Sequence, residues 1–112
     1  MSLVLTTETI AANVNGANVG PTWKGSAAKG VSYFISPKTT TTLNYSNVGS
    51  VSGNVVIQGS LEISPSEDKD WVDLFTIDFS NTSPQTISGH WLWMRGAATT
   101  FTSGNINISI TY

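Results

Sequence analysis

Three carboxylates, an ammonium group and an indole ring stand side by side in the segment EDKDW, residues 67–71. A cluster of this kind can be a metal site, a sugar-binding edge, an acid/base pair or a solvated loop. Calcium would need oxygen ligands from Asp68, Asp70 and Asp73, but the segment lacks the glycine and the closing bidentate glutamate of a calcium loop. The spacing therefore favours a loop in which Asp70 accepts backbone N–H bonds, as in an Asx turn. It implies no metal and no cofactor.

Glu62, Asp73 and Asp78 are the acids whose side chains can be imagined as a pair for glycoside cleavage. One acid of such a pair must keep a raised pKa, and 112 residues leave little room for the cleft that would raise it. The single histidine, His90, lies in an SGH segment that is typical of a turn leading into a strand and not of a nucleophile elbow. These residues predict no catalytic site, and the protein is expected not to be an enzyme.

The segment HWLWMRG, residues 90–96, places large rings where a strand is expected. Side chains alternate between the two faces of a strand, so Leu92 and Met94 share one face. The opposite face then carries two tryptophans and an arginine, which are Trp91, Trp93 and Arg95. Trp and Arg are the usual anchors of protein interfaces, so these three residues are the predicted subunit contact.

Two other interpretations of these rings stay open. Loops or the N-terminal segment of the same chain can cover them within the monomer. Flat exposed rings can also stack on the faces of sugar rings, although the surrounding amides and acids of a sugar site are missing here. A carbohydrate-binding module is therefore the alternative function, and it predicts exposed, coplanar rings from Trp91 and Trp93.

The charge of the chain limits its partners. The formal net charge is -2 and only 11% of the residues are charged, so no basic field attracts phosphate groups and nucleic acid is not an expected partner. No run approaches the roughly 18 apolar residues of a membrane span, and no N-terminal targeting pattern is present, so no membrane is expected either. Cysteine is absent, which removes disulfides and thiolate sites. A surface this neutral suits a protein covered by partner subunits and predicts a homo-oligomer.

Alternation of apolar and polar residues predicts an all-β protein. Ser, Thr, Asn and Gly dominate the polar positions, and they favour strands and turns over helices. The clearest alternation is GNINISITY, residues 104–112, and VVIQGSLEI, residues 55–63, repeats it. Gly59 falls on the inner row of the second segment, where a bulky neighbour is expected to lie across it.

Turn signals separate about eight predicted strands. They lie near residues 2–7, 19–24, 31–36, 40–46, 54–63, 71–79, 90–97 and 104–112. Short strands at this spacing favour two packed antiparallel sheets, and eight of them favour a jelly-roll-like β-sandwich over a seven-stranded immunoglobulin pattern. The length suits one domain, residues 1–112.

The apolar faces of these strands predict the core. The residues assigned to it are Val55, Ile57, Leu61, Ile63, Phe75, Ile77, Leu92, Met94, Ile106, Ile108 and Ile110. One segment, DWVDLFTIDF, breaks the alternation, because a regular strand would turn Asp73 inward between apolar neighbours. A β-bulge near Asp73 is expected to move its carboxylate out.

The order of motifs in the second half resembles a group of small β-sandwich virion proteins of tailed bacteriophages. The features that carry the likeness are a glycine-containing strand ending in GSL, a loop closed by Asp70 and Trp71, the WLWMRG strand and a Gly-led last strand. The likeness covers residues 51–112 well and residues 1–50 poorly. Gly96 departs mildly from it, because a small alanine often follows the arginine in that group.

This resemblance implies a structural component of the phage particle, made in the host cytoplasm. The expected roles are capsid decoration (a cement protein) or a neck- or tail-associated protein. Its expected partners are copies of itself and other virion proteins of the capsid or tail, with no cofactor.

Overall fold

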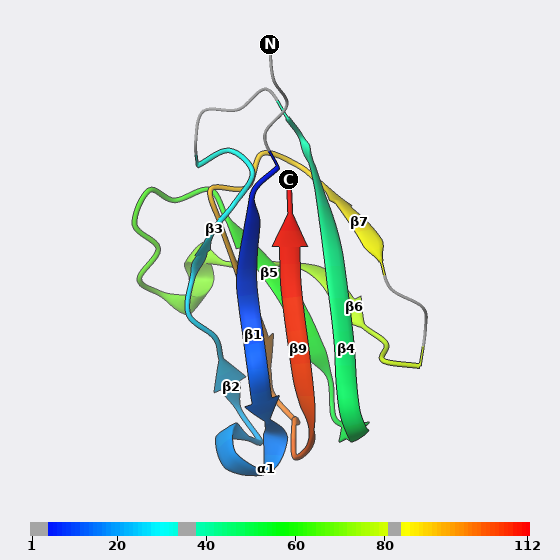
Figure 1. The fold of residues 1–112 in the computed structure, drawn as a ribbon. Helices are drawn as coiled ribbons and strands as arrows, with labels where there is room; N and C mark the ends of the chain where they lie inside the picture. The colour runs from blue at the N-terminus through cyan, green and yellow to red at the C-terminus, as the bar shows by residue number, and fades with distance from the viewer. Residues whose placement is uncertain (1–4, 34–37, 81–83) are drawn as a thin grey trace.

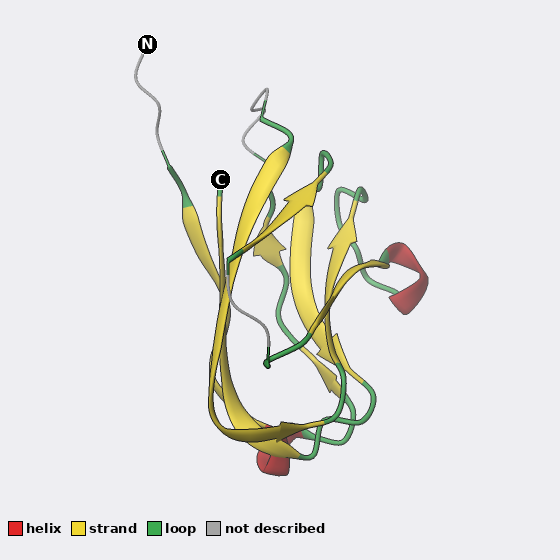
Figure 2. Ribbon diagram, turned by 90° about the vertical axis from the view of Figure 1, so that its right-hand side faces the viewer, coloured by secondary structure: helices red, strands yellow, loops and turns green. Residues whose placement is uncertain are grey.

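The computed structural model describes residues 5–33, 38–80 and 84–112, and in these ranges the chain forms two antiparallel β-sheets packed face to face (Figures 1 and 2). The strands are β1 (Thr7–Asn15), β2 (Trp23–Lys24), β3 (Ala28–Lys29), β4 (Thr40–Ser52), β5 (Val55–Ser60), β6 (Val72–Ile77), β7 (Gln85–Ser88), β8 (Trp93–Ala98) and β9 (Ser103–Thr111). A short helix, α1 (Gly16–Val19), and a 3-10 turn, η1 (Asp68–Asp70), complete the elements. Neither is a candidate for crossing a membrane.

The strand order is that of a jelly roll. The front sheet has the order β1-β9-β4-β7, and the back sheet has the order β2-β8-β5-β6, with β3 also paired to β8 (Figure 1). Because β2 and β3 both lie along β8, they act as two short pieces of one strand position. The predicted all-β sandwich of jelly-roll type is confirmed, with nine described strands instead of about eight.

Strand β9 is the centre of the front sheet and follows the predicted alternation. It pairs with β1 on one side and β4 on the other. Ile106, Ile108 and Ile110 are fully buried between the sheets. On β4, Leu43 and Tyr45 turn to the same interior.

The first strand lies further along the chain than predicted. Residues 2–7 were expected to form it, but β1 begins at Thr7, and residues 1–4 are outside the described part. Two register shifts interrupt its pairing with β9, one between Thr9 and Ala11 and one between Ala11 and Val14. These bulges break the period of two, which is why the alternation did not reveal this strand.

Two further strand predictions fail, and one strand was not predicted. Residues 19–24 contain the end of α1 and only the two residues of β2, because the side chain of Asn15 caps the helix by accepting from the Ala17 N–H. Residues 31–33 form a turn, and residues 34–36 of that predicted strand lie outside the described part. Strand β7 was missed because its four residues hold a single apolar side chain, Ile87, so alternation cannot show there.

Seven of the predicted core residues are buried as expected: Val55, Ile57, Ile77, Met94, Ile106, Ile108 and Ile110. Phe75 packs against them half-buried. Phe101, which no alternating segment indicated, is fully buried and is the largest such side chain in the described residues. It lies against the Trp23 ring, with the two ring centroids 6.3 Å apart in an edge-to-face arrangement.

Leu61, Ile63 and Leu92 were wrongly assigned to the core. Strand β5 ends at Ser60, whose Oγ accepts from the Glu62 N–H and whose carbonyl accepts from the Leu92 N–H. The chain therefore leaves the sheet before Leu61, which is 62% exposed, as is Ile63 at 83%. Leu92 precedes β8 and is half-buried outside the core cluster.

The bulge expected in β6 is present. Ile57 pairs with Phe75 while the next residue, Gln58, pairs with Asp73, so Leu74 is the extra residue. Asp73 consequently turns outward with Gln58. The prediction for Gly59 also holds, because a Cβ there would lie 2.7 Å from atoms of both Leu74 and the Trp91 ring.

Candidate functional site

Arg95 is the centre of a network of side chains on the outer face of the back sheet. Its Nε donates to Gln58 Oε1 at 2.8 Å, and Gln58 Nε2 donates to Asp73 Oδ1 at 2.8 Å. Arg95 Nη2 lies 3.5 Å from Asp68 Oδ1, and Lys24 forms an ion pair with the same carboxylate. Strands β2, β8, β5 and β6 are thereby linked to the β5–β6 connection, which comprises residues 61–71 and lies outside the back sheet (Figure 2).

The β5–β6 connection covers Arg95. The guanidinium carbon lies 4.4 Å from the centroid of the Trp71 ring, at the end of that connection. Only 11% of the Arg95 side chain is exposed. A stacked guanidinium that also donates to fixed acceptors has little freedom left, so Arg95 holds the connection onto β8.

Trp93 lies on the same outward face of β8 and is half-buried. Its Nε1 donates to the Ile63 carbonyl at 3.0 Å, and the Tyr33 ring meets it edge-on with centroids 5.1 Å apart. The outward orientation of Trp93 and Arg95 follows the predicted alternation. The side chains that cover them here belong to the same chain, and a contact with a second copy stays a prediction.

Trp91 does not share that face. It lies before the start of β8, where the alternation does not apply, and it packs against the core cluster over Gly59. Its Nε1 donates to the Ser88 carbonyl at 3.0 Å. The grouping of Trp91 with Trp93 is therefore corrected, and the two indoles do not form one exposed platform.

The acidic segment that ends the connection is organised by its own backbone. Asp70 Oδ2 accepts from the Ser66 and Glu67 N–H groups, each at 3.0 Å, so the expected backbone N–H bonds are present. Both donors precede Asp70 in the chain, which makes this a capping box and not the predicted Asx turn, whose donor lies two residues after the acid. In return, the Glu67 side chain accepts from the Asp70 backbone N–H, which completes the capping box at the start of η1. Asp68 is the one carboxylate of the segment that reaches the sheet, through Lys24 and Arg95. The cluster thus closes a loop.

Acidification should loosen the β5–β6 connection below about pH 4. The backbone N–H bonds from Ser66 and Glu67 hold the pKa of the Asp70 carboxyl below its usual value. A lowered folded-state pKa gives stability that is present above the unfolded-state pKa and is lost as the pH falls through the folded-state value. We expect the Ser66 and Glu67 amide signals in NMR spectra to move together as Asp70 takes up its proton.

The Asp70→Ala variant should show the shifted Ser66 and Glu67 amides already at neutral pH. Asp78→Ala is the matched control, because the pKa of Asp78 is lowered by bonds from Ser80, outside the connection. Amide signals that stay unchanged down to about pH 2 would contradict this role for Asp70.

The three acids considered for glycoside cleavage, Glu62, Asp73 and Asp78, do not form one site. Asp73 belongs to the Arg95 network, Asp78 accepts from the Ser80 N–H at 2.9 Å, and Glu62 is exposed on the connection. Among residues 5–33, 38–80 and 84–112, no three His, Asp or Glu side chains are grouped so that they could hold a metal ion.

His90 stands next to a serine from another turn. Its Nδ1 lies 3.3 Å from Ser32 Oγ, and the histidine itself lies between β7 and β8, outside both strands. A hydroxyl and an imidazole are two members of a catalytic triad, and acid/base work of that kind needs a third group that orients the base.

Sequence reasoning missed three members of the Arg95 network. Gln58 lies in an alternating segment, but nothing in the sequence around it indicates a bond to Arg95. The stacking of Trp71 on a guanidinium has no sequence signal either. Lys24 lies in a strand of only two residues, which no periodicity can show.

We compared the chain with known protein families, curated proteins and solved structures. No protein-family model, no curated protein and no solved structure matches the chain.

Proposed function

We propose that the protein is a non-enzymatic structural protein of a phage particle that acts by packing against copies of itself and neighbouring virion proteins. Capsid decoration, as a cement protein, or a neck- or tail-associated position are its candidate roles. The motif order of residues 51–112 supports the virion assignment. Double-sheet jelly rolls also build viral capsid domains, an analogy at the level of the fold.

Exposed aliphatic side chains on one connection carry the packing part of the proposal. Leu61 and Ile63 stand at the start of the β5–β6 connection and are 62% and 83% exposed, and Val72, directly after its end, is 54% exposed. Large aliphatic groups cost free energy in water and recover it in a protein contact. Since Arg95 and Trp93 hold this connection from beneath, it can meet a partner as a firm surface.

The edges of the sheets favour assembly through this connection over strand pairing. The edge strand β1 contains two register shifts, β6 contains one, and β7 has only four residues. Bulges and short lengths blunt an edge against a foreign strand. Self-association is therefore expected to use side chains of a face or a connection.

Replacing Leu61 and Ile63 together by serine should weaken self-association. Both side chains are exposed to a partner, and interface anchors are worth about 2 kcal/mol or more. Light scattering over a concentration series measures the change, and the thermal midpoint should stay near that of the wild type because neither side chain is in the core.

Val48→Ser is the matched control, because Val48 is 68% exposed but lies on the front sheet. It should leave association unchanged. A wild-type protein that stays monomeric at every concentration, alone and mixed with capsid or tail proteins, would remove the proposed function.

A further inference from the structure

The outward face of the front sheet carries no charge. Within the described strands β1, β4, β7 and β9 the one residue that is charged at neutral pH is Glu8. Glu8 pairs with the buried Ile110, and directly paired residues lie on the same face of a sheet, so Glu8 is on the inner face. The outward side chains are hydroxyls, amides and small apolar groups, whereas the Arg95 network lies on the opposite sheet.

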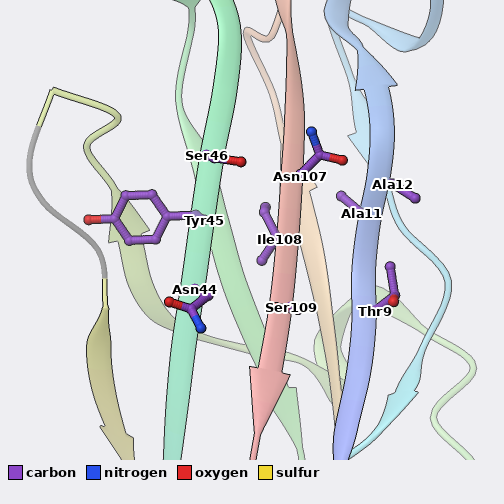
Figure 3. A pocket seen from close by; sticks show the side chains of 9 residues that line it. All are labelled: Thr9, Ala11, Ala12, Asn44, Tyr45, Ser46, Asn107, Ile108 and Ser109. Carbon is purple, nitrogen blue, oxygen red and sulfur yellow. The ribbon is translucent and has the colours of Figure 1, made fainter.

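A shallow hollow lies in the middle of this neutral face. It has a volume of about 550 Å³, and β1, β9 and β4 form it. The outward residues that line it are Thr9, Ala12, Asn44, Ser46, Asn107 and Ser109 (Figure 3). Figure 3 also labels Ala11, Tyr45 and Ile108, whose side chains are buried. None of the residues that line the hollow is charged at neutral pH, so a ligand can enter it without the cost of removing water from a charge.

Asn107 is held in one orientation at the hollow. The Asn13 N–H donates to Asn107 Oδ1 at 2.9 Å, and this bond requires the oxygen, not the nitrogen, of the amide. Asn13 has a positive φ of 51°, at the second register shift of β1. The Asn107 Nδ2 group is thereby left as a positioned donor beside the hydroxyls of Ser46 and Ser109.

The chemistry of the hollow excludes most occupants. Phosphate backbones need Lys or Arg, which this face lacks. A lipid surface needs a broad apolar face, and a protein contact needs aromatic or Arg anchors, whereas the hollow offers only the methyl groups of Ala12 and Thr9 as outward apolar groups. The same surface of a second copy cannot fill it. Two concave surfaces that face each other make no contact at their centres.

We propose that this hollow binds a segment of an uncharged oligosaccharide. Sugar hydroxyls are donors and acceptors at once, which matches a surface of fixed amides and rotating hydroxyls, and a sugar chain is thin enough to lie along the strands. The site is independent of the proposed packing through the β5–β6 connection. On an assembly of many copies, weak single sites would add up by avidity.

The test is a titration of the whole chain, followed through its backbone amide NMR signals. The probes are maltoheptaose, cellohexaose, chitohexaose and mannohexaose, which are all uncharged. At least one should cause saturable shifts that cluster on the residues of the hollow, such as Thr9, Asn44 and Ser109. No shift with any of the four, or shifts that cluster elsewhere, overturns the proposal. Shifts at the hollow on raising the protein concentration without sugar would also overturn it, in favour of a second copy.

Asn107→Asp is the decisive variant. The aspartate keeps an oxygen to accept from the Asn13 N–H, but it replaces the amide donor by a charge. Binding of the responsive sugar should weaken about tenfold or more, because a donor is lost and a charge is left to be desolvated. Unchanged binding overturns the assignment of the site.

Ser109→Tyr is the second variant and fills the hollow with a ring on a residue type that strands accept well. It should also abolish the shifts. Thr76→Tyr, an exposed position on the back sheet, is the matched control and should bind as the wild type does. The amide spectrum itself reports whether each variant is folded.

Discussion

Phe101→Ala is expected to lower the free energy of unfolding by about 3–5 kcal/mol, the usual range for removing a buried phenylalanine. The ring is fully buried and lies against Trp23. It also fills the space over Gly16, where a Cβ would lie 2.7 Å from the ring. Its removal therefore leaves a cavity between the two sheets and α1. Urea unfolding followed by tryptophan fluorescence measures the loss.

The neighbouring Thr102→Ala serves as control for Phe101. Thr102 is exposed, and its backbone N–H, which donates to the Ser52 carbonyl, is kept in the variant. Its effect should stay within about 0.5 kcal/mol. If the phenylalanine variant lost less than about 1 kcal/mol, the ring would not be packed as described.

Ile108→Ala should cost about 2–5 kcal/mol, because a large side chain at the centre of the core leaves a cavity there. Ile108 pairs with Tyr45 on one side and Ala11 on the other, in the middle strand of the front sheet. Ser109→Ala changes the next residue, which faces out, and should stay within about 0.5 kcal/mol. Similar losses for both variants would mean that the face of β9 is assigned wrongly.

The period of two explains which parts of the fold could be predicted. Strand β9 holds three isoleucines in strict alternation, and β5 holds Val55 and Ile57 two residues apart, so these inner faces were predicted correctly up to Ser60, where β5 ends. The bulge of β6 could also be predicted from the sequence. Without it, the carboxylate of Asp73 would point into the core. The number and spacing of the strands favoured a jelly-roll-like sandwich, whereas the pairing of the strands is known only from the structure.

Features that depend on distant contacts had no such signal. Phe101 stands in a segment between β8 and β9, and only the tertiary structure places it between the sheets. Strand β1 carries two bulges, so its buried residues Ile10 and Ala11 are adjacent in sequence. Two adjacent buried residues do not fit the alternation of a strand. They therefore do not show which face of β1 is buried until its pairing with β9 is known.

The sequence predicted which way the side chains of the candidate site point, but not which residues surround them. Alternation set the outward direction of Trp93 and Arg95 correctly, because both lie inside β8. It failed for Trp91, which lies two residues before that strand. What covers Arg95 depends on the path of the β5–β6 connection, and the path is set by the Asp68 ion pair and the Trp71 stacking, which involve residues far from Arg95 in sequence.

The central place of β9 in the front sheet bears on how the chain folds. Its partners β1 and β4 are not hydrogen-bonded to each other, so neither can complete its pairing on a ribosome until residues 103–111 have emerged. Pairing β1 with β9 closes a loop of most of the chain, and contacts of such long sequence separation form slowly. During this interval both strands present open edges to other nascent chains.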